Sequence, residues 1–153
     1  MEVSLRSVRF TCGRCGTTYR DGLLLGGYGR LVVRDATGRH PSVADLMADP
    51  LVDLLGQVAG ERAALFARVA TTPADVQGAY LRLCDPSPAG LPWDRDALPC
   101  CPSCGAQPTA HERLEELLTT DLPLLRHGAF DALPREQQRA AAAGALTARV
   151  PSR

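Results

Sequence analysis

Cysteines are the residues of this 153-residue chain whose type and spacing predict a definite chemistry. Two short segments, CGRCG at 12–16 and CPSCG at 101–105, each hold two thiols that are separated by two residues and followed by glycine. We call these segments the first and second knuckles. A two-residue gap lets both sulfurs of a knuckle reach one ion, and the glycine permits the tight turn that follows. The spacing therefore predicts one tetrahedral four-thiolate site formed by Cys12, Cys15, Cys101 and Cys104.

Zinc is the metal that we expect at this site, because it is borderline-soft and takes four thiolates tetrahedrally without redox cost. A redox-active iron site is one alternative. In another, no metal is shared, and the knuckles stay separate or pair as disulfides. Cys101 is preferred to Cys100 as a ligand because only Cys101 leaves a two-residue gap before Cys104. Cys84 is expected to be a small buried hydrophobic residue.

Signatures of catalysis are absent from the chain. The sequence contains no HExxH, no GxSxG and no phosphate-binding glycine-rich loop. Four thiolates would also leave no open coordination position for water or substrate. We therefore expect a protein that is not an enzyme.

Short strands are expected to carry the first knuckle. Residues 3–10 alternate between apolar and polar side chains, as a half-buried strand does. Residues 17–20 and 31–33 are also compatible with strands, and residues 35–38 have the composition of a turn. A strand, a knuckle and a second strand follow one another in that order, as at the start of a zinc ribbon.

The hydrophobic period changes to that of helices between the knuckles. Asp49 is a predicted N-cap with Pro50 at the first helical position, and this helix is expected to break near Gly60. Residues 72–75 (TPAD) are predicted to open a second helix. Four prolines within residues 85–99 then predict a loop.

Helices are also expected after the second knuckle. Thr109 and Glu112 match a capping box, and the leucines at 114, 117 and 118 would form the apolar face of that helix. A short helix is expected within 121–132, and an alanine-rich helix from Pro134 to about residue 148.

The knuckles resemble those of the zinc-ribbon and rubredoxin-like proteins. The resemblance covers residues 10–20 and 99–112, and the second knuckle has the CPxCG form of that group. It implies a small β-sheet closed by a four-cysteine metal site. Rubredoxins have much shorter spacing between their knuckles and more core aromatic residues, whereas 85 residues (16–100) lie between these two. A zinc ribbon with a helical insertion therefore fits better than an iron-containing electron carrier.

The predicted fold class is α+β, within a single domain over residues 1–153. A small zinc-ribbon sheet would carry both knuckles, with a helical insertion between them and a helical C-terminal region. The expected segments are a ribbon at 3–35 plus 98–108, the insertion at 40–84, the proline-rich loop at 85–99 and C-terminal helices at 109–149.

The composition of the chain indicates the type of genome that encodes it and the compartment in which we expect it. The chain has no Lys, Ile or Asn, and all 17 basic residues are Arg, which indicates a GC-rich bacterial genome. No run of 18 apolar residues and no secretory leader is found, so we expect a cytoplasmic protein that does not span a membrane. In that reducing compartment paired CxxC motifs bind metals more often than they form disulfides.

Charge separates the candidate functions. The net charge is zero, but residues 1–39 carry +4 and residues 40–99 carry −4. This mixture favours a protein-interaction adaptor or accessory subunit whose partner is another protein. One alternative is a nucleic-acid-binding ribbon, and the other is a rubredoxin-like electron carrier. The nucleic-acid contacts would be arginines of the basic N-terminal lobe: Arg6, Arg9, Arg14, Arg20, Arg30 and Arg34.

Overall fold

The computed structural model describes residues 1–23, 29–65 and 71–148, and confirms the α+β class. The described residues form two small antiparallel sheets and four helices, which belong to two compact units, each built from two stretches of chain. The sheet unit comprises residues 1–45 and 86–125, and the helical unit comprises residues 46–85 and 126–153. The single domain over 1–153 stays a prediction.

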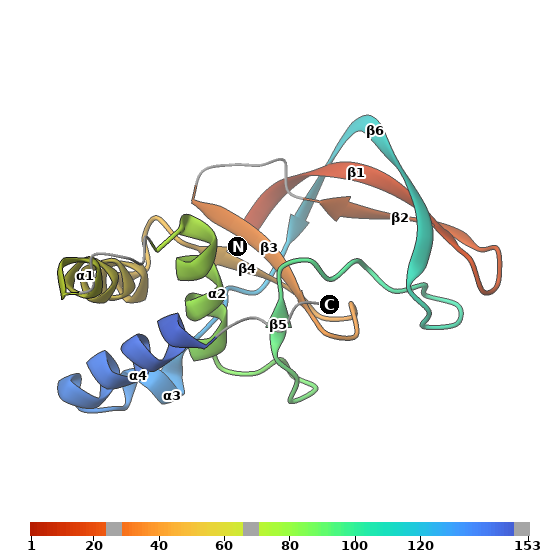
Figure 1. Cartoon of the computed structure of the whole chain (residues 1–153). Helices are drawn as coiled ribbons and strands as arrows, with labels where there is room; N and C mark the ends of the chain where they lie inside the picture. Colours follow the sequence, from red (N-terminus) through yellow and green to blue (C-terminus); the bar gives the residue numbers. More distant parts are fainter. Residues whose placement is uncertain (24–28, 66–70, 149–153) are drawn as a thin grey trace. The chain divides into compact units, whose positions relative to one another are not determined.

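The first sheet of the sheet unit has the strand order β2-β1-β6 (Figure 1). These strands are β1 (Glu2–Cys12), β2 (Thr18–Leu23) and β6 (Pro108–Asp121), and β1 pairs antiparallel with both neighbours. Val3, Leu5 and Phe10 of β1 are buried, as the alternating pattern predicts, but the alternation is interrupted at Ser7 and Val8. Both of these residues are buried, at the point where the register with β6 shifts.

The second sheet has the order β4-β3-β5, formed by β3 (Arg30–Asp35), β4 (Pro41–Asp45) and β5 (Trp93–Asp94). Part of the core of the sheet unit is a cluster to which both sheets contribute: Val3, Leu5, Val32, Val43 and Leu122. The chain after β6 covers the free edge of β4, because Val43 N donates to Pro123 O and Val43 O accepts from Leu125 N. Burying this edge removes a site of unwanted strand pairing.

β6 corrects one prediction. The helix expected to begin at Thr109 is a 14-residue strand. The two side chains of the predicted capping box serve the strand pair instead: Thr109 Oγ1 donates to Thr11 O, and Glu112 accepts a hydrogen bond from Arg9. Ladder bonds to β1 along most of the strand outweigh a local cap, because tertiary pairing commonly overrides intrinsic propensity.

Two other segment predictions need correction. The insertion expected to be helical from residue 40 begins with β4, and the loop expected at 85–99 contains the short strand β5. Strands this short carry little periodicity, and both depend on pairing with β3.

The helical unit contains α1 (Pro50–Leu65), α2 (Pro73–Leu83), α3 (Gly128–Asp131) and α4 (Arg135–Thr147). Both predicted helix starts within the insertion are confirmed. Asp49 Oδ1 accepts from Leu51 N at 2.9 Å, and Thr72 and Asp75 form a complete capping box. The break expected near Gly60 is wrong, because α1 continues to Leu65.

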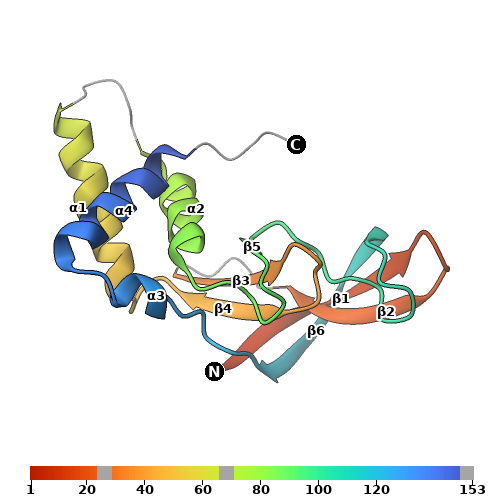
Figure 2. The same ribbon diagram turned by 90° about the horizontal axis from the view of Figure 1, so that it is seen from below.

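α4 packs against both α1 and α2 (Figure 2). Its buried face is formed by Ala142 and Ala145, whose small side chains permit close approach of the helices. Two arginines of the other helices donate to its backbone carbonyls: Arg62 to Ala143 and Arg82 to Ala145. The alanine-rich helix is therefore an integral part of this unit.

Candidate metal centre

The first knuckle is a tight turn that follows β1. Cys12 N donates to Thr17 O at 3.0 Å, and Gly16 N donates to Cys12 O at 2.9 Å. Gly16 has a φ of +71°, in the left-handed region that favours glycine. The glycine after the second cysteine therefore lets the chain reverse and enter β2.

The second knuckle repeats this geometry. Cys101 N donates to Ala106 O at 2.8 Å, and Gly105 N donates to Cys101 O at 2.8 Å. The φ of Gly105 is also +71°. Two segments far apart in the sequence thus adopt the same backbone, with the first cysteine of each buried and the second more accessible.

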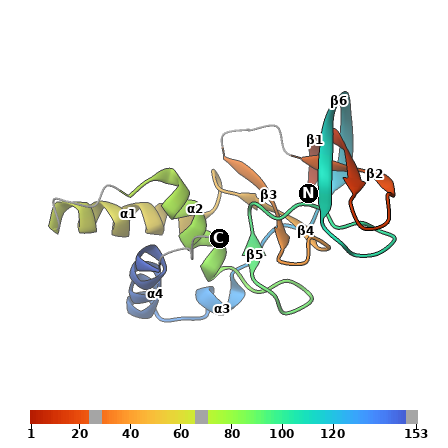
Figure 3. The ribbon, with the colours of Figure 1, turned by 45° about the vertical axis from the view of Figure 1, so that its right-hand side comes forward.

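Strand pairing brings the two knuckles together. Cys12, at the end of β1, is paired with Pro108, at the start of β6. The loop that follows β1 and the loop that precedes β6 therefore lie side by side (Figures 1 and 3). The antiparallel register of this strand pair therefore brings the four thiols to one end of the sheet.

The sulfurs of Cys12, Cys15, Cys101 and Cys104 all lie within 4.8 Å of one another. Cys12 Sγ is 3.5 Å from Cys104 Sγ, and Cys15 Sγ is 3.6 Å from Cys101 Sγ. A disulfide needs about 2.05 Å, whereas tetrahedral metal–sulfur bonds of about 2.3 Å separate the sulfurs by about 3.8 Å. The donor set and its spacing therefore fit one tetrahedrally held metal ion.

Hydrogen bonds shift the acidities of the clustered thiols. The backbone N–H of Cys15, with that of Arg14, lowers the pKa of Cys12 although burial opposes the shift. The hydroxyl and backbone N–H of Thr17 lower the pKa of Cys15 to about 6. The N–H of Ala106 lowers the pKa of Cys104, but the neighbouring thiols and burial outweigh it and raise that pKa to about 12. A thiol must lose its proton to bind a metal, so binding of a dication would release protons from this cluster.

Aromatic and basic side chains border the cluster. The rings of Phe10 and Tyr19 stack with centroids 5.6 Å apart, and the Tyr19 hydroxyl donates to Pro99 O at 2.7 Å. Arg39 lies against the second knuckle, since a Cβ at Gly105 would fall 2.6 Å from its guanidinium. This cation can partly offset the formal charge of −2 on a dication with four thiolates.

The remaining cysteines lie outside the cluster. Cys100 is half-buried, and its N–H donates to Gly38 O at 3.4 Å. Cys84 is the C-cap of α2, where burial raises the pKa of its thiol to about 12. His111 is an exposed residue of β6 whose ring lies 6.1 Å from that of Phe10.

Four of the six arginines proposed as nucleic-acid contacts are paired with carboxylates. Arg9 and Arg20 bind glutamates of β6, and Arg30 binds Asp45. Arg34 is buried and donates to Asp21 at 2.8 Å. Arg6 is half-buried and Arg14 is exposed on the first knuckle. The acidic residues that neutralise Arg9 and Arg20 are Glu112 and Glu116.

Comparison of the chain with protein-family models, with curated proteins and with solved structures finds no match. No helix among the residues that the structure describes is long and apolar enough to cross a membrane. The site is therefore interpreted from its own geometry, which is compatible with a zinc ribbon.

Sequence reasoning missed one polar cluster, which lies in the helical unit. His127 Nε2 lies 3.0 Å from Asp49 Oδ1, and Asp49 Oδ2 accepts from the Tyr80 hydroxyl at 2.7 Å. His127 Nδ1 lies 2.9 Å from Asp131 Oδ1, without the alignment of a hydrogen bond. The spacing of His127 and Asp131, four residues apart, was the only signal in the sequence. Asp49 and Tyr80 come from distant segments.

Proposed function

We propose that this protein is a non-enzymatic zinc ribbon whose metal is structural and whose surfaces bind another protein as an adaptor or accessory subunit. The observation that carries the structural role is the clustering of four thiols from two knuckles of matching geometry. Zinc is the ion that such a donor set favours when no redox chemistry is required.

The zinc would cross-link the two knuckles within the sheet unit. Cys12, Cys15, Cys101 and Cys104 would hold it, joining the ends of a loop of 85 residues. In the chain-entropy account, closing a long loop restricts the unfolded chain most, and metal binding contributes directly to folding free energy. A unit built from two three-stranded sheets has a small core, so this contribution matters to its stability.

An interaction role is favoured over catalysis by the closed coordination of four thiolates, which leaves no position for a substrate. Pairing of most of the candidate arginines with carboxylates argues against a nucleic-acid role, because phosphate binding depends on available cations. An electron-carrier role would require iron in the same site, and the metal content distinguishes that possibility.

Co-purification from the source cells tests the adaptor role. We expect the tagged full chain to recover one protein in a constant molar ratio, and the ratio to survive nuclease treatment. Recovery of nucleic acid alone, with binding that weakens steeply as salt is raised, would instead establish the ribbon as a nucleic-acid binder.

A further inference from the structure

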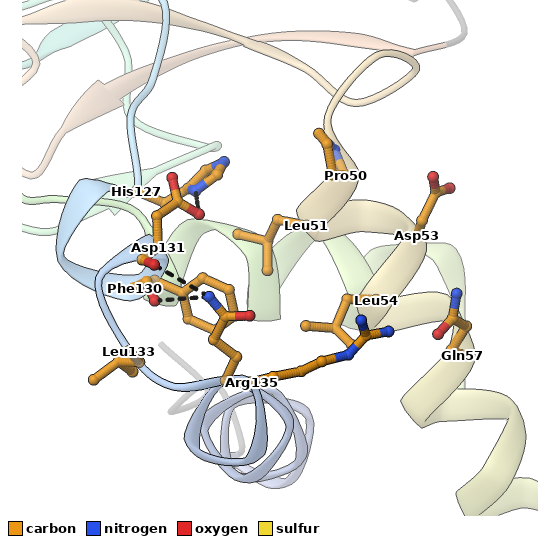
Figure 4. Close-up of a pocket in the computed structure, with 11 residues that line it drawn as sticks. Pro50, Leu51, Asp53, Leu54, Gln57, His127, Phe130, Asp131, Leu133 and Arg135 are labelled. Atoms are coloured by element: carbon orange, nitrogen blue, oxygen red, sulfur yellow. Dashed lines mark hydrogen bonds and ion pairs between the residues drawn. The ribbon is translucent and has the colours of Figure 1, made fainter.

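A groove of about 650 Å³ lies within the helical unit, between the N-terminal half of α1 and the segment 127–138 (Figure 4). Volumes of this size are typical of ligand-binding sites. The side chains at its base are apolar. Leu51 and Phe130 are buried, and Leu54 and Leu133 are half-buried.

The rim of the groove is open to solvent. Five of its lining residues are exposed: Pro50, Asp53, Gln57, Asp131 and Arg135. Sites for small molecules usually enclose 70–90% or more of the ligand, which this open rim does not favour. An open apolar groove between helices suits a segment of polypeptide, whose outer face can stay in water.

Some charged side chains near the rim form ion pairs and others do not. Arg139, one turn along α4, binds Glu61, with Nη2 2.6 Å from Oε1. In the part of the chain that the structure describes, neither Arg135 on α4 nor Asp53 on α1 has a hydrogen bond or ion pair through its side chain. An arginine in the first turn of a helix is also electrostatically unfavourable, because it faces the positive end of the helix dipole.

His127 forms one wall of the groove and is not available as a catalytic base. Asp49 accepts at its Nε2, and Asp131 faces its Nδ1. Its ring also packs edge-on against Phe130, with centroids 6.2 Å apart. Contacts on both nitrogens and the ring hold this wall in one position, which lowers the entropy cost of binding.

We propose that this groove binds a short segment of the partner protein that carries a large apolar side chain between an acidic and a basic residue. The apolar side chain would occupy the base, the acidic residue would pair with Arg135, and the basic residue with Asp53. This inference rests on the proposed adaptor function and names the surface and the sequence chemistry that the partner would present.

Selection of a random dodecapeptide library on the full-length metal-loaded protein tests the proposal. We expect the selected peptides to share the pattern of acidic, apolar and basic residues. Binding should perturb the NMR signals of Leu51, Leu54 and Phe130. The affinity of these peptides should fall by at least about tenfold in Arg135→Glu.

Charge exchange provides the sharper arm of the test. The double variant Asp53→Arg, Arg135→Glu should prefer peptides in which the acidic and basic positions are exchanged. Arg126→Glu makes the same change at an exposed site outside the groove lining and should bind like the original protein. Since all three positions are exposed, the helical circular dichroism signal should be retained in these variants.

Failure of the library to yield peptides, or binding that is unaffected by Arg135→Glu, would overturn the groove as a docking site. If a native partner co-purifies equally well with Arg135→Glu, the adaptor function is supported but the groove is not its binding site. A groove that binds a small molecule but none of the library peptides would also contradict the proposal.

Discussion

His127 shows how one side chain can connect three segments of the helical unit. It contacts Asp49 before α1, Asp131 in α3 and, through Asp49, Tyr80 in α2. Burial alone would lower the pKa of His127, but the neighbouring carboxylates of Asp49 and Asp131 outweigh it and raise that pKa. Folding therefore favours the protonated ring relative to the unfolded chain.

This preference predicts a pH-dependent stability. A histidine whose pKa is raised by folding stabilises the folded state below its unfolded pKa of about 6.5, and loses that contribution as pH rises through the folded pKa. We expect His127→Gln to lower the free energy of unfolding by roughly 1–3 kcal/mol near pH 5.5 and by less near pH 9. Urea denaturation across this range measures the difference.

A double-mutant cycle provides the control. In an Asp49→Asn background the pH-dependent part of the His127→Gln effect should shrink, because the main attracting carboxylate is gone. An equal cost of His127→Gln at acidic and alkaline pH would show that the ring contributes packing alone.

At the scale of elements, the turn between β3 and β4 holds the segment that leads to the second knuckle. Asp35 is fully buried and accepts from Thr37, Arg39 and Ser87. Gly38 O accepts from Cys100 N at 3.4 Å. The turn therefore helps to position Cys101 and Cys104, although its residues are far from these two cysteines in the sequence.

Two glycines with the same backbone angle test this packing. Gly38 and Gly90 both have a φ of +74°, but a Cβ at Gly38 would lie 2.1 Å from Leu98 O, whereas the space at Gly90 is open. We expect Gly90→Ala to cost about 1–2 kcal/mol of unfolding free energy from backbone strain. Gly38→Ala should cost at least roughly 3 kcal/mol and weaken metal retention. Equal costs for the two variants would contradict the close contact.

Local patterns were enough to predict the elements whose signals lie within a few residues. The strand β1, the starts of α1 and α2 and the grouping of the cysteines follow from alternation, caps and the two-residue gap. β6 was misread because Leu114, Leu117 and Leu118 have helical spacing, while its pairing with β1 lies about a hundred residues away. The groove and the contacts of His127 depend on such long-range neighbours and could not be predicted locally.

At the scale of the whole molecule, the chain passes three times between the sheet unit and the helical unit. All four clustered thiols lie in the sheet unit. The helical unit is held by packing among α1, α2 and α4 and by hydrogen bonds to the α4 backbone. Metal is therefore expected to stabilise one unit directly and the other little.

Removal of the metal by a chelator should destabilise the sheet unit more than the helical unit. After metal removal we expect the amides of β1, β2 and β6 to lose protection from hydrogen exchange first, while those of α1 and α4 keep most of theirs. Hydrogen exchange followed by mass spectrometry resolves the two sets. Uniform loss of protection in both units, or no loss in the sheet unit, would contradict the structural role of the metal.

The metal content of the purified chain and of single cysteine variants tests the central claim most directly. Elemental analysis with native mass spectrometry should find one zinc ion per chain. That ion should be lost or greatly weakened in Cys12→Ser, Cys15→Ser, Cys101→Ser and Cys104→Ser, and retained in the controls Cys84→Ser and Cys100→Ser. A chain that binds no metal, or that keeps its zinc in Cys101→Ser and loses it in Cys100→Ser, would contradict the account.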